Sequence, residues 1–290
     1  MACEMATASN VLSRNATMAE TPETQRLHLL AELVSSGQCR PWQGPLKIGV
    51  DPGTANIALV VLDEEDNPVA GISHPSRAVR DGVVVDFLAA SQVVRRLKST
   101  LEQRLNLSLS SAATAIPPGI LPGNTKVIIN MMEATGFNVT RVVDEPVAAA
   151  RALNIKDGAV VDIGGGTTGI SVLRQGEVIF SADEPTGGNH MTLVLSGALG
   201  LSFSQAETLK KSAEQQEYVF SLVRPVAEKM AYLVAGWLEN YPVETLYLVG
   251  GASSFEQFAD VFRKMTQKSV IQATQPLLVT PLGIAMHCSG

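Results

Sequence analysis

Three shortages in the sequence narrow what the protein can be. Its three cysteines form no CxxC pair and cannot all pair with one another, which indicates a reducing, cytoplasmic setting rather than a disulfide framework. No apolar run reaches the roughly 18 residues that a membrane-spanning helix needs. The first residues also lack the basic start and apolar stretch of a signal peptide. We therefore expect no membrane partner.

The sequence also has fewer basic than acidic residues. The formal net charge is −6, so a broad basic surface for nucleic acid is not expected. An anionic ligand would then have to be held largely by backbone N–H groups, helix N-termini and a metal ion.

What the chain does have is apolar material, with 46% hydrophobic residues among 290. That is enough for one large domain or for two lobes. Residues 1–45 are expected to form a flexible N-terminal segment with a short helix at about 22–36, because Pro22 suits a first helical turn and Gly37 a stop. The globular body begins at Leu46.

Apolar periodicity and turn residues predict a mixture of strands and helices in this body. A helix after Asp86 would bury one face, and a capping-box pattern at Ser204–Glu207 predicts the start of another helix. The other strands and helices are expected over 47–50, 57–62, 83–85, 112–116, 125–135, 139–143, 146–153, 217–240, 246–249, 255–267 and 281–288.

One local pattern occurs twice, at Val50–Thr54 and at Val161–Thr167. Each copy is a strand that ends in Asp, followed by glycine, threonine and another apolar strand. About a hundred residues separate the two copies. A repeat of this kind implies two similar lobes, each with one acidic glycine turn.

The residue types in the two turns suit a phosphate that is bound to a metal. Glycine lets the backbone approach a ligand closely, and successive N–H groups form an anion nest. The carboxylates of Asp51 and Asp162 would repel phosphate unless a cation lay beside them, and Mg²⁺ is often held by one or two carboxylates with phosphate oxygens. A single acidic glycine turn is more often a plain β-turn than a phosphate site. Two such turns in one chain indicate a phosphate site more strongly than one does.

Five motifs in the chain resemble those of the actin, sugar-kinase and DnaK-type chaperone superfamily, and the first looks closest to the bacterial MreB version. Together they cover about residues 46–290. The motifs occur in the order found in the superfamily. They are the first phosphate motif (Ile48–Asn56), the first connecting helix (Asp144–Ala150), the second phosphate motif (Val161–Thr168), the adenosine motif (Leu248–Ser253) and the second connecting helix (Pro281–Ala285).

The resemblance implies an α/β actin-like ATPase fold, which is a duplicated ribonuclease H-like fold, with two lobes flanking a nucleotide cleft. Lobe I would comprise residues 46–154, with a C-terminal helix at 281–290 returning to it. Lobe II would comprise residues 155–280.

A closer resemblance is to the EutJ family of ethanolamine-utilization proteins. It is carried by Arg80–Phe87, by Ser181–His190 and by the short length of the chain. That family is described as chaperone-like and belongs to operons for ethanolamine breakdown in bacterial microcompartments. The resemblance implies ethanolamine-degrading enzymes or microcompartment proteins as partners, and a cytoplasmic location that includes the microcompartment.

The superfamily resemblance also implies ATP or ADP with Mg²⁺ as ligands. Asp51 and Asp162 would hold Mg²⁺ through water, and Glu145, with Asp162, would orient the attacking water and act as its base. The residues implied in nucleotide binding are Gly53, Thr54, Asn56, Gly164, Gly165, Gly166, Thr167, Thr168, Gly188, Glu207, Lys210, Gly250, Gly251 and Ser253. Of these, the last three would pack on the adenosine, and Glu207 and Lys210 would contact ribose and adenine.

Two of these assignments have a local alternative. Glu207 could instead be the acid of the capping box. Glu145 could be a first-turn acid that the helix dipole favours.

Some positions depart from the superfamily pattern. Gly169 stands where relatives carry an acid, and Asn189 and His190 replace an acidic pair. No lysine lies in the first phosphate loop. Arg77 or Arg80 could reach the phosphates, although a solvated arginine is the simpler interpretation.

Three functions are compatible with these features. The first is a slow Mg²⁺-dependent ATPase, with a low rate expected because the loop lysine is missing. The second is a nucleotide-gated binding module, whose client would dock on this domain or on the N-terminal segment because the chain ends after the second connecting helix. The third, which we favour least, is a filament protein. The helix at 22–36 could be an address for packing into a microcompartment or a helix docked on the core.

Overall fold

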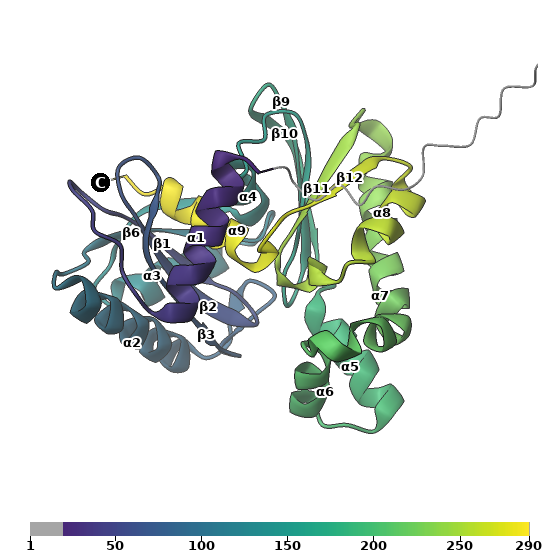
Figure 1. Ribbon diagram of the computed structural model, residues 1–290, viewed down its shortest axis with the longest axis horizontal. Helices are drawn as coiled ribbons and strands as arrows, with labels where there is room; N and C mark the ends of the chain where they lie inside the picture. The colour runs from purple at the N-terminus through teal and green to yellow at the C-terminus, as the bar shows by residue number, and fades with distance from the viewer. Residues whose placement is uncertain (1–19, 290) are drawn as a thin grey trace, which may run out of the picture.

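The computed structural model describes residues 20–289, which form two five-stranded sheets of the same design (Figure 1). The first sheet has the strand order β3-β2-β1-β6-β7 and the second β10-β9-β8-β11-β12. In each sheet the first three strands pair antiparallel and the remaining pairings are parallel. This repeated topology confirms the predicted actin-like α/β fold.

The first sheet and its helices come from the first half of the chain. A helix on this sheet, α2, is capped by the Asp86 carboxylate, which accepts from the Ala89 N–H, and its predicted face is buried. The elements are β1 (Lys47–Pro52), β2 (Asn56–Leu62), β3 (Pro68–Pro75), α2 (Phe87–Leu105), β6 (Ser111–Ile116), α3 (Pro122–Glu133), β7 (Asn138–Asp144) and α4 (Glu145–Ala152). Between β3 and α2, β4 (Val79–Arg80) and β5 (Val83–Val84) pair with each other in a separate two-stranded sheet.

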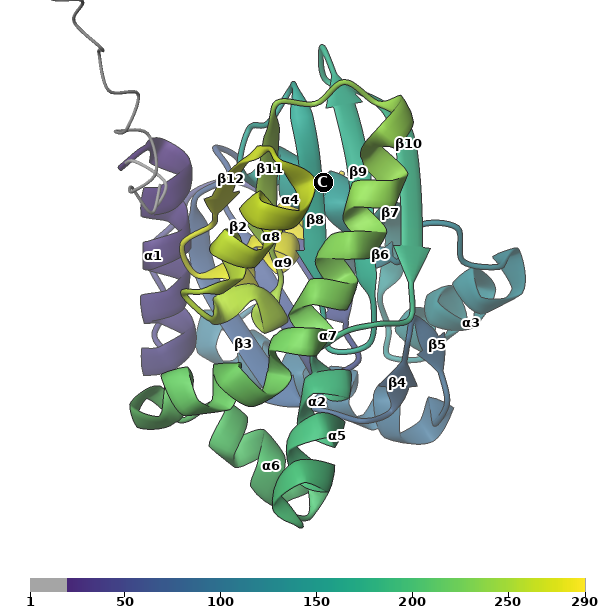
Figure 2. The ribbon, with the colours of Figure 1, turned by 90° about the vertical axis from the view of Figure 1, so that its right-hand side faces the viewer.

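The second sheet carries the long helix α7 and, beyond one end of the sheet, the helices α5 and α6 (Figure 2). The elements are β8 (Gly158–Ile163), β9 (Thr168–Arg174), β10 (Glu177–Glu184), α5 (Gly188–Leu199), α6 (Phe203–Lys210), α7 (Gln216–Trp237), β11 (Thr245–Val249), α8 (Phe258–Thr266), β12 (Ser269–Gln272) and α9 (Pro276–Met286).

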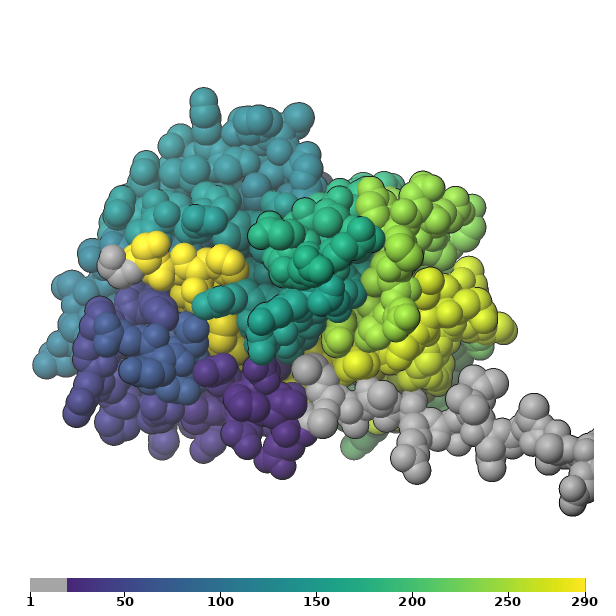
Figure 3. All heavy atoms as spheres, turned by 90° about the horizontal axis from the view of Figure 1, so that it is seen from above, coloured from purple at the N-terminus to yellow at the C-terminus, as the bar shows by residue number. Residues whose placement is uncertain are grey.

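The last helix, α9, follows the second sheet in the chain but packs against β1, β2 and β6 of the first sheet and against α4. In Figure 3 its yellow residues lie among the purple, blue and teal residues of the first half of the chain. The crossing with α4 is so close that a Cβ on Gly283 would lie 1.8 Å from the Ala148 carbonyl oxygen. The helix begins at Pro276, earlier than predicted, and Pro281 lies inside it. Pro281 removes one backbone hydrogen bond from the helix, and the packing of its buried residues 278–286 offsets that loss.

The helix α1 spans Pro22–Ser36 and is docked on the core. Leu27 and Leu30 are fully buried, and the helix packs on β3 and α9. This packing favours the docked interpretation over an exposed address. The part of the predicted flexible segment that precedes residue 20 lies outside the described residues.

The start of α6 differs from the prediction. The capping box is formed by Ser202 and Gln205, whose side chains bond each other's backbone N–H groups, and not by Ser204 and Glu207. The predicted box is wrong by two residues because the sequence offers a Ser-x-x-Gln pair just ahead of it. Glu207 is thereby free for another role.

Candidate functional site

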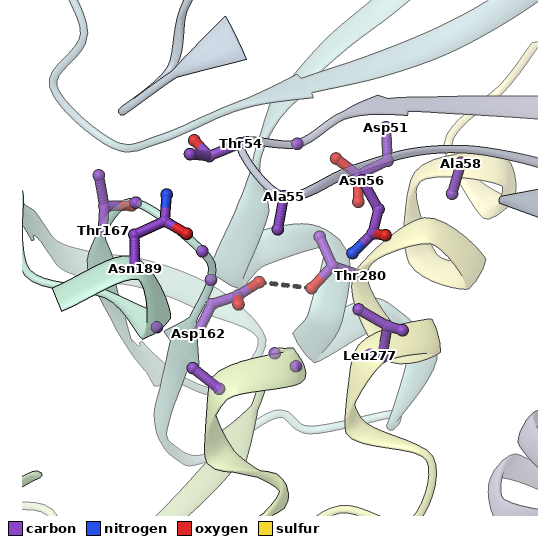
Figure 4. Close-up of a pocket in the computed structure, with 18 of the residues that line it drawn as sticks. Asp51, Thr54, Ala55, Asn56, Ala58, Asp162, Thr167, Asn189, Leu277 and Thr280 are labelled. Atoms are coloured by element: carbon purple, nitrogen blue, oxygen red, sulfur yellow. Dashed lines mark hydrogen bonds between the residues drawn. The ribbon is translucent and has the colours of Figure 1, made fainter. Parts of the chain in front are cut away.

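The two glycine turns meet at the mouth of a pocket of about 480 Å³ between the sheets (Figure 4). A Cβ on Gly165 would lie 2.8 Å from the Ala55 Cβ, and one on Gly166 would lie 2.8 Å from the Thr54 Oγ1. Only glycine fits where the loops come this close. The predicted residues that line the pocket are Asp51, Gly53, Thr54, Asn56, Glu145, Asp162, Gly164, Gly165, Gly166, Thr167, Gly188, Glu207, Lys210, Gly250 and Gly251.

Both turns present backbone N–H groups that lack an acceptor. Among the described residues, nothing accepts from the N–H groups of residues 53–55 or of residues 165–167. The second loop is held in shape from behind, since Gly188 N–H donates to Gly164 O at 2.9 Å and Asn189 N–H to Gly165 O at 2.7 Å. Two rows of fixed, unpaired donors at a pocket form a site for an anion with several oxygens.

Three carboxylates lie beside these donors, one each from β1, β8 and the first turn of α4. Burial, and to a smaller extent the charge of the nearby Asp162, raise the pKa of Asp51 to about 7. Burial also raises the pKa of Asp162 to about 6, against a hydrogen bond from the Thr280 hydroxyl that lowers it. The pKa of Glu145 is raised well above its usual value by burial and by both aspartates.

Within the described part of the chain, no basic side chain forms an ion pair with these three carboxylates. Residues 20–289 also contain no group of three His, Cys, Asp or Glu side chains placed to hold a metal directly. The donor set therefore fits a Mg²⁺ ion that keeps most of its waters and also binds phosphate oxygens.

Two predicted residues are not at the pocket. The Thr168 hydroxyl is buried and donates to Thr186 O at 2.6 Å. The Ser253 hydroxyl is also buried and donates to Gly250 O at 2.8 Å. The Ser253 hydroxyl thus stabilises a local turn, and the Thr168 hydroxyl joins β9 to the segment after β10.

Glu207 and Lys210 line the pocket, but their charged groups are engaged with the protein. The Lys210 Nζ lies 2.7 Å from Glu207, 2.8 Å from the Thr192 Oγ1 and 2.9 Å from Gly188 O, which uses all three of its donors. Burial alone would raise the pKa of Glu207, yet the bond from Lys210, with others, lowers it to about 2. The pair thus joins α6 to the first turn of α5.

At the adenosine side, Gly250 has a φ of +84°, which favours glycine. The backbone of Gly250 and Gly251 borders the pocket together with the apolar side chains of Phe255, Leu277 and Leu278. This end of the pocket suits a flat apolar group.

Comparison with known proteins agrees with this architecture. The model of the MreB/Mbl protein family matches residues 72–196 and that of cell division protein FtsA matches residues 159–283. The ethanolamine utilization protein EutJ of Escherichia coli (strain K12) is 40% identical over 263 residues, which are 90% of this chain and 92% of that protein. The chain belongs to the EutJ family of ethanolamine utilization proteins.

Solved structures extend the comparison. The crystal structure of EutJ from Carboxydothermus hydrogenoformans has a TM-score of 0.86 at 46% identity, and the match covers 91% of this chain and 97% of that one. MreB5 of Spiroplasma citri bound to AMPPNP has a TM-score of 0.69 at 17% identity, over 84% and 96% of the two chains, which shows a shared fold. No helix within residues 20–289 has the length and apolarity to cross a membrane.

The positions where this EutJ-family chain departs from the superfamily pattern have local explanations. The His190 Nδ1 accepts from the Gly187 N–H at 3.1 Å and so caps α5, while Asn189 lines the pocket. Arg77 and Arg80 do not line it. Arg77 instead lies over the Phe203 ring, 4.7 Å from its centroid.

Sequence reasoning missed several polar residues at or near the site, among them Thr280 and Asp183 next to the buried carboxylates; the missed lining residues also include Ser73, Lys211, Gln216 and Ser254. Thr280 of α9 donates to the Asp162 carboxylate (Figure 4). Asp183 of β10 lies near Asp162 and Glu145, and its own pKa is raised to about 7, mainly by burial. Neither belongs to an acidic glycine turn, so the pattern that pointed to Asp51 and Asp162 does not point to them.

Proposed function

We propose that this chain binds ATP with Mg²⁺ in the pocket and hydrolyses it slowly. The proposal rests on one observation: unpaired N–H groups and buried, uncompensated carboxylates line the same end of one pocket. Phosphate oxygens would accept from the N–H groups, and a cation would compensate the carboxylates. The AMPPNP bound to MreB5, which shares the fold, supports a nucleotide as the ligand.

In this proposal, Asp51 and Asp162 hold Mg²⁺ through water, and the two glycine turns hold the phosphates. Glu145 orients the attacking water and accepts its proton, because a carboxylate with a raised pKa is a better base. Mg²⁺, when bound, would offset the charge that develops on the phosphate oxygens. The rate would be low because neither glycine turn carries a lysine or arginine.

Calorimetric titration of ATP and ADP, with and without Mg²⁺, tests binding. We expect Mg²⁺-dependent binding to the wild type and at least tenfold weaker binding to Asp51→Ala. Phosphate release then tests hydrolysis, and we expect it to fall to background in Asp162→Asn and Glu145→Ala. Absence of nucleotide binding to the wild type would refute the proposal, whereas binding without phosphate release would refute only the ATPase.

A second candidate function is a nucleotide-gated binding module, and the contact of Arg77 with Phe203 favours it. Arg77 follows β3 of the first sheet, and Phe203 is the first residue of α6, which belongs to the half of the chain that carries the second sheet. The contact between them therefore spans the cleft. A nucleotide that binds one closure state more tightly would shift the population of the two states. Identical hydrogen-exchange patterns with ATP, ADP and no nucleotide would count against gating.

We also propose that the partner is a protein of ethanolamine breakdown, either an enzyme or a microcompartment component, and that the chain acts on it in the cytoplasm as a chaperone does. The membership of the EutJ family supports this context. Co-purification of tagged chain with ethanolamine-degrading enzymes or shells, compared between ATP and ADP, is the test. Failure to recover any of these proteins in either state would refute it.

A further inference from the structure

Asp183 occupies the space that a side chain at position 169 would fill. Strands β9 and β10 pair antiparallel, with Asp183 directly opposite Gly169. Residues opposite each other in such a pair project from the same face of the sheet. A Cβ on Gly169 would lie only 3.1 Å from the Asp183 Oδ1. The absence of a side chain on one strand thus makes room for the carboxyl group of the other.

The Oδ1 atom of Asp183 is buried and has no hydrogen-bond partner within residues 20–289. Buried polar atoms are rarely left unpaired, so this oxygen requires an explanation. Asp183 does not itself line the pocket, but Gly169 stands opposite Asp162 on its other side, so Asp162, Gly169 and Asp183 form one row on the same face of the sheet. The same Cβ on Gly169 would lie 3.4 Å from Pro146, which follows Glu145, and the Thr167 side chain bonds the Asp183 carboxyl group.

We propose that Asp183 is a positioning residue of the phosphate site, whose free oxygen accepts a hydrogen bond from a water molecule bound to the cation that Asp51 and Asp162 would hold. The inference rests on the proposed function, because it assigns a further residue to the same site. It accounts for both the orphaned oxygen and the glycine opposite. If the role of Asp183 were only to fill space in β10, its charge would not matter.

The first test removes the charge and keeps the shape. Asp183→Asn is compared with Glu184→Gln, whose side chain points to the opposite face of β10. The measurement is calorimetric titration of ADP over a series of Mg²⁺ concentrations. We expect Asp183→Asn to need about tenfold more Mg²⁺ for half-maximal tightening of ADP binding. Glu184→Gln should behave as wild type, and ADP binding without Mg²⁺ should change little in either variant.

The second test moves the carboxylate across the strand pair. In the double variant Gly169→Asp with Asp183→Gly, the carboxyl group comes from β9 and occupies the same place. We expect it to recover most of the Mg²⁺ dependence that Asp183→Gly alone loses. A structural role in β10 would not be rescued this way, and thermal melting curves identify a variant that fails to fold.

The outcomes separate the two proposals. Wild-type Mg²⁺ dependence in Asp183→Asn, or no recovery in a folded double variant, would overturn the role of Asp183 and leave nucleotide binding standing. A wild type that binds no ADP at any Mg²⁺ concentration would instead overturn the proposed function, and this inference with it.

Discussion

Gly250 connects β11 to the pocket and lies directly against one of its carboxylates. With its φ of +84°, a Cβ here would lie 2.3 Å from the Asp162 Oδ1 and 2.4 Å from the Ile163 carbonyl oxygen. Gly250→Ala is therefore strained in its backbone and displaces the carboxylate. We expect at least tenfold weaker Mg²⁺-dependent ADP binding and a loss of roughly 1–3 kcal/mol in the free energy of unfolding. Calorimetry and urea unfolding measure the two effects.

Gly197→Ala is the matched control. Gly197 lies inside α5, and an added Cβ would meet nothing within 4 Å. Because alanine is the better helix former, this variant should gain about 0.5–1 kcal/mol and bind ADP as wild type. Equal ADP affinity of Gly250→Ala and Gly197→Ala would contradict the proposed contact of Gly250 with the site.

At the same scale, the sequence allowed some site residues to be predicted and not others. Asp51 and Asp162 could be predicted because each belongs to a turn that a short motif of successive residues specifies. Thr280 could not, since it reaches Asp162 across 118 positions of sequence through the packing of α9. Asp183 depends on the register of β10 against β9, which no local pattern specifies.

Among the elements, those that the sequence prediction omitted include β3, β10, α5 and β12, of which β10 and α5 lie next to the site. Strand β10 is half exposed over its whole length and has no strict alternation, so its residues do not resemble a buried strand. Helix α5 begins at glycine residues, without a side-chain hydroxyl or carboxylate cap. The strong periodicity of α2, by contrast, predicts its buried face because that face packs on a single sheet.

Also at the scale of elements, the contact of Arg77 with Phe203 joins the loop after β3 to α6 across the cleft. A cation–π contact at an exposed site is worth about 0.5–1 kcal/mol. If it holds the cleft closed, Arg77→Gln and Phe203→Leu should each release a fluorescent ADP analogue about two to five times faster. The double variant should release it no faster than the single variants do. Stopped-flow fluorescence gives these rates.

Arg80→Gln is the control for this cycle, because Arg80 is an exposed arginine in the same segment without a contact to the pocket or to α6. It should release the analogue at the wild-type rate. Strictly additive effects of the Arg77 and Phe203 changes would show that the contact does not couple the two sides of the cleft.

For the whole molecule, the fold gathers Asp51, Glu145 and Asp162 at one pocket, and none of the three has a basic partner within residues 20–289. Because the two sheets share one topology, each carries one acidic turn at the same place. Helices α4 and α9 pack against each other and against strands of the sheets, which holds the two turns together. The arrangement costs stability when no cation is bound, since like charges repel and are partly desolvated. The binding site and a pH-dependent instability thus have the same origin.

The sign of this pH dependence follows from the direction of the shifts. The pKa values of Asp51, Asp162 and Asp183 rise to about 7, 6 and 7, so the folded state keeps protons that the unfolded state loses above about pH 4. The stabilisation that these protons provide is fully present below the pKa values of the unfolded state, and it is lost as the pH rises through about 7. Without nucleotide and Mg²⁺, we therefore expect the free energy of unfolding to fall between pH 5 and pH 8.

Asp51→Asn removes one of these charges, so the variant should be more stable than wild type at pH 8, by about 1–2 kcal/mol, and nearly equal only at about pH 4, close to the unfolded pKa. This is less than the full pKa shift would give, because the pocket admits water. Urea unfolding across the pH range measures it, with the exposed Glu214→Gln as control. Mg²⁺ with ADP should flatten the wild-type profile. A wild type that gains stability from pH 5 to pH 8 would contradict the uncompensated charge on which the proposed site depends.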